Sequence, residues 1–197
     1  LFRQWQAWGL APDFVAGHSV GELSAAHVAG VFTLEDAARL VCARGRLMQA
    51  CRGGGAMAAI EASEAEVQPL LDDRVDIAGL NAPRQVVLSG DQDAVDRIGS
   101  YFKDCGRRVR PLRVSHAFHS PHMDAMLEEY RQIAESCRFV KPTLAIVSTV
   151  QGTLDAPVTT PEYWVHQARA AVRFVDAMVT LENQGVRRFL ECGPAAV

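Results

Sequence analysis

A serine between two glycines is the feature of this sequence that could most directly do chemistry. Gly17-His18-Ser19-Val20-Gly21 has the form G-x-S-x-G and follows a short apolar run, residues 14–16. This is the pattern of a nucleophile elbow, in which a strand turns sharply into a helix and exposes a serine hydroxyl at the turn. Ser19 would then lie at a helix N-terminus, where free backbone N–H groups can stabilise an oxyanion. The alternative is an ordinary serine in a glycine-rich turn, because so short a motif also arises by chance.

Three closely spaced histidines, His116, His119 and His122, are candidates for the base that a serine nucleophile needs. His119 precedes Ser120-Pro121, an N-cap followed by proline at the first helical position. The positive end of that helix would favour the neutral imidazole that a base requires. Two alternatives remain. The H-x-x-H-x-x-H spacing resembles a metal site, although Pro121 argues against one shared face. The histidines could also be partly exposed loop residues, which we favour for His122.

Arg44 is a charged residue in an otherwise apolar stripe. We expect a helix from Leu34 to about Cys51, in which apolar residues recur at helical spacing. Arg44 falls among them, whereas Arg39 and Arg46 lie on the opposite face. A guanidinium that faces the core needs an anion, because a buried unpaired charge is costly. The pattern alone favours an internal ion pair with an aspartate or glutamate; the alternative is a planar fork that binds a substrate carboxylate.

Strands that alternate with helices must position these side chains. Between Gly55 and Ser115 the expected order is strand, helix, strand, strand, helix, strand, which is the ferredoxin-like pattern. The other expected strands are residues 14–16, 143–150 and 186–192, and the later helices are residues 120–137, a helix opened by Thr160, and residues 172–182. This alternation predicts an α/β fold with a mostly parallel sheet in a large subdomain, residues 1–54 and 116–197, and a small inserted subdomain, residues 55–115.

Composition narrows the function classes. The chain has 197 residues, 49% of them hydrophobic, and a net charge of −3 without a long basic run, so we expect no nucleic-acid partner. Neither a bilayer-spanning apolar stretch nor a signal peptide is visible, so we expect no membrane partner. The five cysteines are scattered, odd in number and without a C-x-x-C pair, which favours free thiols in the cytoplasm. The chain begins with Leu1 in an expected helix, and we expect it to be a fragment of a longer polypeptide.

Four motifs in order carry a family resemblance. They are Gly17-His18-Ser19-Val20-Gly21-Glu22, Ala43-Arg44-Gly45-Arg46-Leu47-Met48, His116-Ala117-Phe118-His119-Ser120 and Glu191-Cys192-Gly193-Pro194. Together they resemble the malonyl-CoA:acyl-carrier-protein transacylase family and, more narrowly, the acyltransferase domains of modular (type I) polyketide synthases. The resemblance covers essentially the whole chain. It implies an α/β-hydrolase-like large subdomain with a ferredoxin-like insertion.

The resemblance assigns roles residue by residue. It implies that Ser19 is the nucleophile, His119 the base, and the Val20 backbone N–H an oxyanion donor. It implies that Arg44 grips the free carboxylate of the extender unit, with His18, His116 and Phe118 also at the substrate. Phe118 is bulky where the methylmalonyl-selecting class has a small serine, which implies malonyl selection. The family orients its histidine through a backbone carbonyl, which we expect near Ser148-Thr149.

The implied activity is transfer of a malonyl group from malonyl-CoA to the phosphopantetheine thiol of an acyl carrier protein, in polyketide or fatty acid biosynthesis. The implied partners are that carrier protein and the neighbouring ketosynthase and linker domains; no metal or redox cofactor is implied. Three features depart from the family pattern: the upstream G-Q-G-x-Q strand is absent, Thr149 replaces an asparagine, and Cys192 replaces a leucine. Two other functions stay open, a serine hydrolase of the thioesterase type and a non-catalytic docking module of a synthase.

Overall fold

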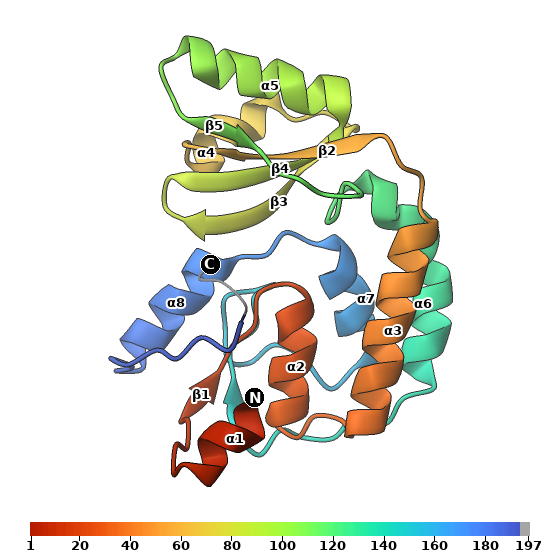
Figure 1. The fold of residues 1–197 in the computed structure, drawn as a ribbon, viewed down its shortest axis with the longest axis vertical. Coiled ribbons are helices and arrows are strands. Elements are labelled where there is room, and N and C mark those ends of the chain that lie inside the picture. The colour runs from red at the N-terminus through yellow and green to blue at the C-terminus, as the bar shows by residue number, and fades with distance from the viewer. Residues whose placement is uncertain (194–197) are drawn as a thin grey trace.

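The computed structural model describes residues 1–193 as an α/β protein with a large and a small subdomain (Figure 1). The large subdomain contains α1 (Phe2–Ala7), β1 (Phe14–Val15), α2 (Val20–Val28), α3 (Leu34–Ala50), the 3₁₀ helix η2 (Pro121–Met126), α6 (Leu127–Glu135), β6 (Ala145–Ile146), α7 (Pro161–Arg169) and α8 (Phe174–Asn183). The small subdomain contains β2 (Gly55–Ile60), α4 (Glu64–Val67), the 3₁₀ helix η1 (Gln68–Leu70), β3 (Val75–Ala82), β4 (Gln85–Asp91), α5 (Gln92–Asp104) and β5 (Val109–Pro111).

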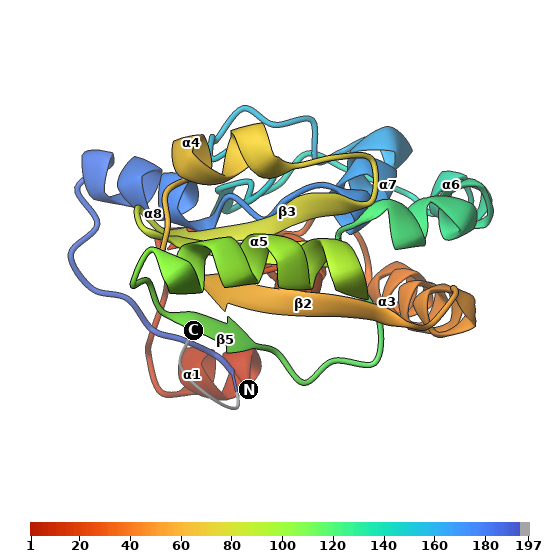
Figure 2. The same cartoon turned by 90° about the horizontal axis from the view of Figure 1, so that it is seen from above.

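The small subdomain is an antiparallel sheet in the order β3-β4-β2-β5, with α4 and α5 over one face (Figure 2). This is the ferredoxin-like arrangement that the sequence predicts. The side chains of β2 alternate between the two faces, as a strand requires. Ala58 and Ile60 enter the core beneath the helices, whereas Met57 packs with Ala78 and Val87 on the other face. That second face contacts Phe118 of the large subdomain and so lies next to the site described below.

The large subdomain is built around a parallel pair, β1 with β6, in the register Phe14↔Ala145 and Val15↔Ile146. Helices α2, α3, α6 and α7 share one core, in which Leu23, Leu40 and Trp164 are fully buried. The parallel sheet predicted for this part is confirmed, but it is shorter than the sequence indicates, since β6 is only two residues long.

The predicted strand over residues 186–192 is wrong, because this segment runs as irregular chain. A strand needs a neighbour to take up its backbone N–H and C=O groups. In the part of the chain that the structure describes, β1 and β6 pair only with each other. Phe189 and Leu190 are correspondingly exposed. The Pro194 end of the fourth motif lies outside the described residues.

Several polar contacts join the two subdomains. Arg169 at the end of α7 pairs with Asp76 of β3 at 2.6 Å and with Asp124 of η2 at 2.5 Å. Arg173 pairs with Glu64 of α4 at 3.0 Å and Asp176 of α8 at 2.6 Å. The small subdomain is therefore held against the end of α7 and the start of α8. None of the helices within residues 1–193 has the length and apolar character to cross a membrane.

Candidate active site

Ser19 stands at the turn between β1 and α2, as a nucleophile elbow requires. Its backbone has φ 51° and ψ −117°, a conformation uncommon for a non-glycine residue. Gly17 makes the turn possible, because a Cβ there would lie 2.2 Å from the backbone carbon of Gly21. Val20 is the first residue of α2, where backbone N–H groups have no partner within the helix. The Val20 N–H therefore has no partner within its own helix.

His119 forms a hydrogen-bonded pair with Ser19. The Ser19 Oγ lies 2.7 Å from His119 Nε2, and His119 Nδ1 lies 2.7 Å from the Ala170 carbonyl oxygen. A carbonyl only accepts, so Nδ1 carries the proton and Nε2 is left to accept from the serine hydroxyl. The orienting carbonyl is that of Ala170, at the C-cap of α7, and the prediction that it lies near Ser148-Thr149 is wrong.

Burial keeps His119 in its neutral form. The pKa of His119 is lowered from 6.5 to about 3, first by burial and second by the positive charge of Arg44, while the hydrogen bond to Ala170 opposes the shift. The sequence suggested that a helix N-terminus would have this effect. The low pKa instead arises from loss of solvent and from a neighbouring cation. The imidazole is thus available as a proton acceptor at neutral pH.

Arg44 lies on the buried face of α3 and points at Ser19. It is 5% exposed, and its Nη2 donates to the Ser19 Oγ at 3.0 Å. Its Nε is buried without a hydrogen-bond partner, and no ion pair to Arg44 occurs within the described ranges. The internal ion pair favoured from the pattern alone is therefore wrong. Burial lowers the pKa of Arg44, although a guanidinium stays charged. Its donors remain available to an anion beside the serine.

Glu22 organises a buried polar network under the elbow that the sequence analysis missed. It is fully buried, and burial raises the pKa of its carboxyl against the opposing hydrogen bonds. It accepts from the Thr149 N–H at 3.0 Å, from the Thr149 Oγ1 at 2.7 Å, from the Tyr163 hydroxyl and from the Gln167 Nε2 at 3.2 Å. Gln167 also donates to the Ser19 carbonyl oxygen at 2.7 Å. The signal for Gln167 was a polar residue between Trp164 and Ala168 on an apolar stripe, the same signal that marked Arg44.

The other predicted substrate residues, His18, His116 and Phe118, contact groups outside the Ser19–His119–Arg44 group. His18 Nε2 donates to Asn81 Oδ1 of β3 at 2.9 Å, and its ring packs on Phe174, so His18 joins the elbow to the small subdomain. His116 is buried, 3.0 Å from the Ser115 hydroxyl and in ring contact with Phe118. Phe118 is half-buried and packs against the cores of both subdomains.

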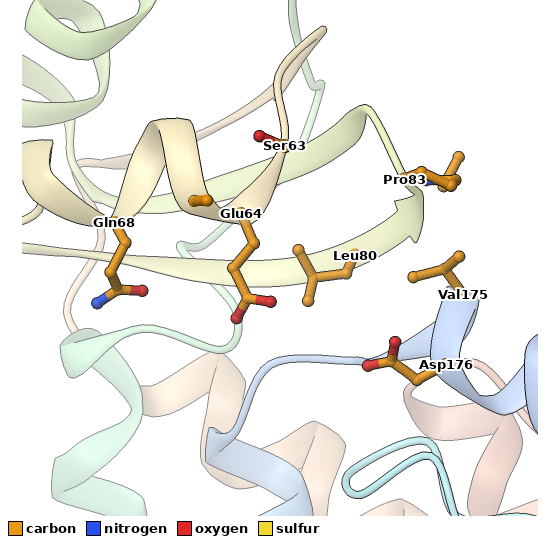
Figure 3. A pocket seen from close by; sticks show the side chains of 9 residues that line it. Ser63, Glu64, Gln68, Leu80, Pro83, Val175 and Asp176 are labelled. Atoms are coloured by element: carbon orange, nitrogen blue, oxygen red, sulfur yellow. The ribbon is translucent and has the colours of Figure 1, made fainter.

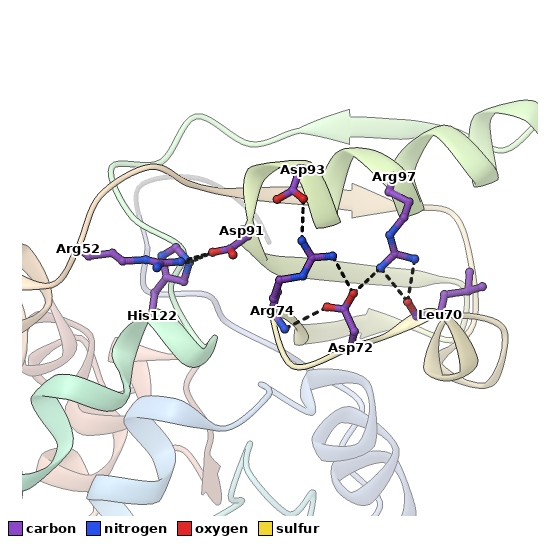
Figure 4. Close-up of polar contacts among 8 residues, drawn as sticks. All are labelled: Arg52, Leu70, Asp72, Arg74, Asp91, Asp93, Arg97 and His122. Carbon is purple, nitrogen blue, oxygen red and sulfur yellow. Dashed lines mark hydrogen bonds and ion pairs between the residues drawn. The ribbon is translucent and has the colours of Figure 1, made fainter.

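His122 is buried, which contradicts the prediction of a partly exposed loop residue. Its Nε2 lies 2.6 Å from Asp91 Oδ1 at the end of β4, and Arg52 pairs with the same carboxylate. Figure 4 shows both side chains pointing at Asp91, beside a separate group formed by Asp72, Arg74, Asp93 and Arg97. The three histidines therefore have different partners. Among residues 1–193, no group of three or more His, Cys, Asp or Glu side chains could hold a metal ion.

A cavity of about 530 Å³ lies between the small subdomain and α8 (Figure 3). It is lined by Ser63, Glu64, Ala65, Gln68, Leu80, Ala82, Pro83, Val175 and Asp176. Its two carboxylates, Glu64 and Asp176, are both paired with Arg173. The cavity shares no residue with the Ser19–His119–Arg44 group, and its lining residues come from both the small subdomain and α8.

Comparisons with known proteins agree on one family. The family model described as acyl transferase domain matches residues 1–197. The phenolphthiocerol synthesis polyketide synthase type I Pks15/1 of Mycobacterium marinum is 55% identical over 199 residues, covering 100% of this chain and 10% of that protein. The chain thus spans about a tenth of that relative.

Solved structures give the same answer. The acyltransferase domain from the second module of the salinomycin polyketide synthase matches with a TM-score of 0.97 and 49% identity, covering 100% of this chain and 47% of that chain. The malonyl CoA-acyl carrier protein transacylase of Coxiella burnetii matches with a TM-score of 0.91 and 33% identity, covering 98% of this chain and 65% of that chain. Together with the family model over residues 1–197, these matches show that the chain belongs to the acyl transferase domain family.

Proposed function

We propose that this acyltransferase moves a malonyl group from malonyl-CoA to the phosphopantetheine thiol of an acyl carrier protein, through an ester on Ser19. One observation carries the proposal. The buried Arg44 guanidinium has an unpaired Nε and donates to the same Ser19 hydroxyl that is hydrogen-bonded to His119. A nucleophile beside a desolvated cation suits an acyl group that ends in a carboxylate.

The proposed reaction proceeds in two half-reactions. His119 Nε2 takes the hydroxyl proton as Ser19 Oγ attacks the thioester carbonyl, and the Val20 N–H stabilises the oxyanion that forms. Collapse of the tetrahedral intermediate breaks the C–S bond, and the imidazolium returns its proton to the leaving coenzyme A sulfur. In the second half-reaction His119 takes the proton of the carrier thiol, the thiolate attacks the Ser19 ester, and the imidazolium returns the proton to the Ser19 oxygen as it leaves. The two half-reactions give ping-pong kinetics. No metal or redox cofactor takes part in this scheme.

Substrate choice would rest on two side chains. Arg44 would bind the malonyl carboxylate as a bidentate fork. Phe118 is half-buried between the two cores, and its bulk would disfavour an α-methyl group, so malonyl would be preferred to methylmalonyl. The similarity to a malonyl CoA-acyl carrier protein transacylase and to domains of multidomain synthases supports a carrier-protein acceptor and neighbouring domains in a longer polypeptide.

The test compares malonyl-CoA with acetyl-CoA, which differ in the charge that Arg44 would bind. Arg44→Ala should lower kcat/KM for malonyl transfer by an amount equivalent to about 2–5 kcal/mol and leave acetyl transfer nearly unchanged. Arg44→Lys should restore only part of the malonyl activity, because an ammonium lacks the fork. Equal losses for both substrates, together with a lowered Tm, would contradict the carboxylate role.

Two controls separate this proposal from its alternatives. Intact-protein mass spectrometry should find the acyl adduct on the wild-type protein and none on a folded Ser19→Ala variant. Carrier loading should exceed release of free malonate; the reverse ratio would identify a hydrolase. A fully folded protein that forms no adduct would identify a non-catalytic docking module.

A further inference from the structure

The last turn of α7 contacts both members of the Ser19–His119 pair. Gln167 Nε2 donates to the Ser19 carbonyl oxygen at 2.7 Å. Three residues later, the Ala170 carbonyl accepts from His119 Nδ1 at 2.7 Å. The C-terminal end of α7 is therefore hydrogen-bonded both to the imidazole of His119 and to the backbone of Ser19.

The carbonyl that Gln167 holds belongs to the same peptide unit as the Val20 N–H. In a planar trans peptide the C=O and the N–H point in opposite directions, so the direction of one determines the direction of the other. Ser19 has a positive φ of 51°, which a non-glycine residue keeps only when its surroundings impose it. Two donors act on its carbonyl, the Gln167 side chain and the Glu22 N–H at 3.0 Å. Gln167 is the one of the two that comes from another element.

Gln167 is itself held in one orientation. It is 2% exposed, and both groups that face its amide, the Ser19 carbonyl and Glu22 Oε2, are acceptors, so the amide nitrogen must face them. Its Oε1 is buried without a partner, an arrangement that costs free energy. Thr149 donates to both oxygens of the Glu22 carboxylate, through its N–H and its hydroxyl. The side chain thus leaves one acceptor unpaired while donating twice under the elbow.

We propose that Gln167 is a positioning residue for the oxyanion site: through the Ser19 carbonyl, it aims the Val20 N–H at the oxygen that becomes charged when Ser19 attacks. The inference rests on the proposed function and adds a specific role to it. The oxyanion forms with any acyl group, so the role of Gln167 is independent of the carboxylate that Arg44 would bind. Its loss should change kcat, not substrate choice.

The first test uses Gln167→Met, which keeps the length of the side chain and removes both donors. We expect kcat for acylation to fall about 10- to 100-fold, with KM within about twofold of the wild-type value and the same factor for malonyl-CoA and acetyl-CoA. Thr160→Ala is the matched control. It removes the N-cap of the same helix, a hydrogen bond of 3.3 Å to the Tyr163 N–H, without touching the Ser19 peptide. An unchanged kcat in Gln167→Met, or an equal kcat loss in Thr160→Ala at a similar Tm, would overturn the proposal.

The second test uses Gln167→Glu and keeps the proposal open to refutation if the methionine variant does not fold. A protonated carboxyl can donate one hydrogen bond to the Ser19 carbonyl, whereas the ionised form can donate none. The kcat of Gln167→Glu should therefore rise as the pH is lowered from about 8 to about 5, while the wild-type value stays level. A kcat that stays level and well below the wild-type value down to about pH 5 would overturn the proposal. Loading of Ser19→Ala would refute the proposed function itself, whereas normal Gln167 variants of an enzyme that loads on Ser19 refute only this inference.

Discussion

Ser19 and His119 are the two non-glycine residues with positive φ within residues 1–193, at 51° and 57°. Backbone strain of this kind concentrates at functional sites, because the surrounding structure must impose it. Each of the two also has a hydrogen bond to α7 or its C-cap: the Ser19 carbonyl accepts from Gln167 Nε2, and the His119 ring donates to the Ala170 carbonyl. At the scale of single residues, the site is therefore defined by backbone carbonyls as much as by side-chain identity.

The low pKa of His119 leads to a prediction about pH. Because the pKa is about 3, the imidazole stays neutral across the range in which an ordinary histidine, with a pKa near 6.5, becomes protonated. The single-turnover acylation rate should therefore stay level between about pH 8 and pH 5. A stopped-flow or rapid-quench profile that falls with a midpoint near pH 6.5 would contradict the buried neutral base.

The same shift affects stability with a definite sign. In the unfolded chain His119 is protonated below about pH 6.5, whereas in the folded protein it is protonated only below its pKa of about 3. The unfolded state therefore binds more protons between these values, and the free energy of unfolding falls as the pH drops through this window. His119→Gln should remove that part of the acid sensitivity. Chemical denaturation of both proteins at pH 7 and at pH 5 measures the difference, and an unchanged slope would contradict it.

Some of these residue-level features were predictable from the sequence and others were not. The position of Arg44 on a buried face follows from helical periodicity, and the structure has it there. The prediction that the carbonyl orienting His119 lies near Ser148-Thr149 is wrong, because every residue type has a backbone carbonyl and the sequence cannot indicate which one is used. The buried His122 is paired with Asp91, a residue 31 positions away that only the folded sheet brings close.

At the scale of elements, the elbow depends on one of its two glycines. A Cβ on Gly17 would meet the backbone of Gly21 and Glu22 at 2.2–2.4 Å, whereas a Cβ on Gly21 has no atom within 4 Å. Gly17→Ala should therefore lower the free energy of unfolding by at least about 3 kcal/mol and abolish loading of Ser19. Gly21→Ala, the matched control, should leave stability unchanged or raise it by up to about 1 kcal/mol, because alanine favours a helix. Equal Tm values for the two variants would contradict this account.

Element prediction succeeded where the signal was local. The helix predicted from Leu34 to about Cys51 is α3, Leu34–Ala50, and its Thr33 cap accepts from the Asp36 N–H at 3.1 Å. The ferredoxin-like order was recognisable from local signals, among them the Ser63–Glu66 capping box that opens α4. The strand expected at residues 186–192 failed because strand formation depends on a pairing neighbour, which local periodicity cannot supply.

At the scale of the whole molecule, ion pairs connect the two subdomains. Arg169 bridges Asp76 and Asp124 and is about three-quarters buried. Arg169→Met should lower the free energy of unfolding by about 1–3 kcal/mol, with a smaller difference at high salt. Arg46→Met, which breaks an exposed pair with Glu129 inside the large subdomain, should cost less than about 1 kcal/mol. Denaturation in low and high salt compares them, and equal losses would contradict a special role for the bridge.

The pairing of β2 with β5 has a consequence for how this fold can be altered. The inserted unit begins in β2 and ends in β5, and the two strands run side by side, with Ala58 opposite Pro111. Both connections to the rest of the chain pass through exposed residues, Gly53 and Gly54 on one side and Val114 and Ser115 on the other. Because its first and last strands are neighbours, we expect that the unit can be exchanged for that of a relative. A chimera that takes it from a relative needs two surface junctions and the polar residues that contact the large subdomain, namely Glu64, Asp76, Asn81 and Asp91.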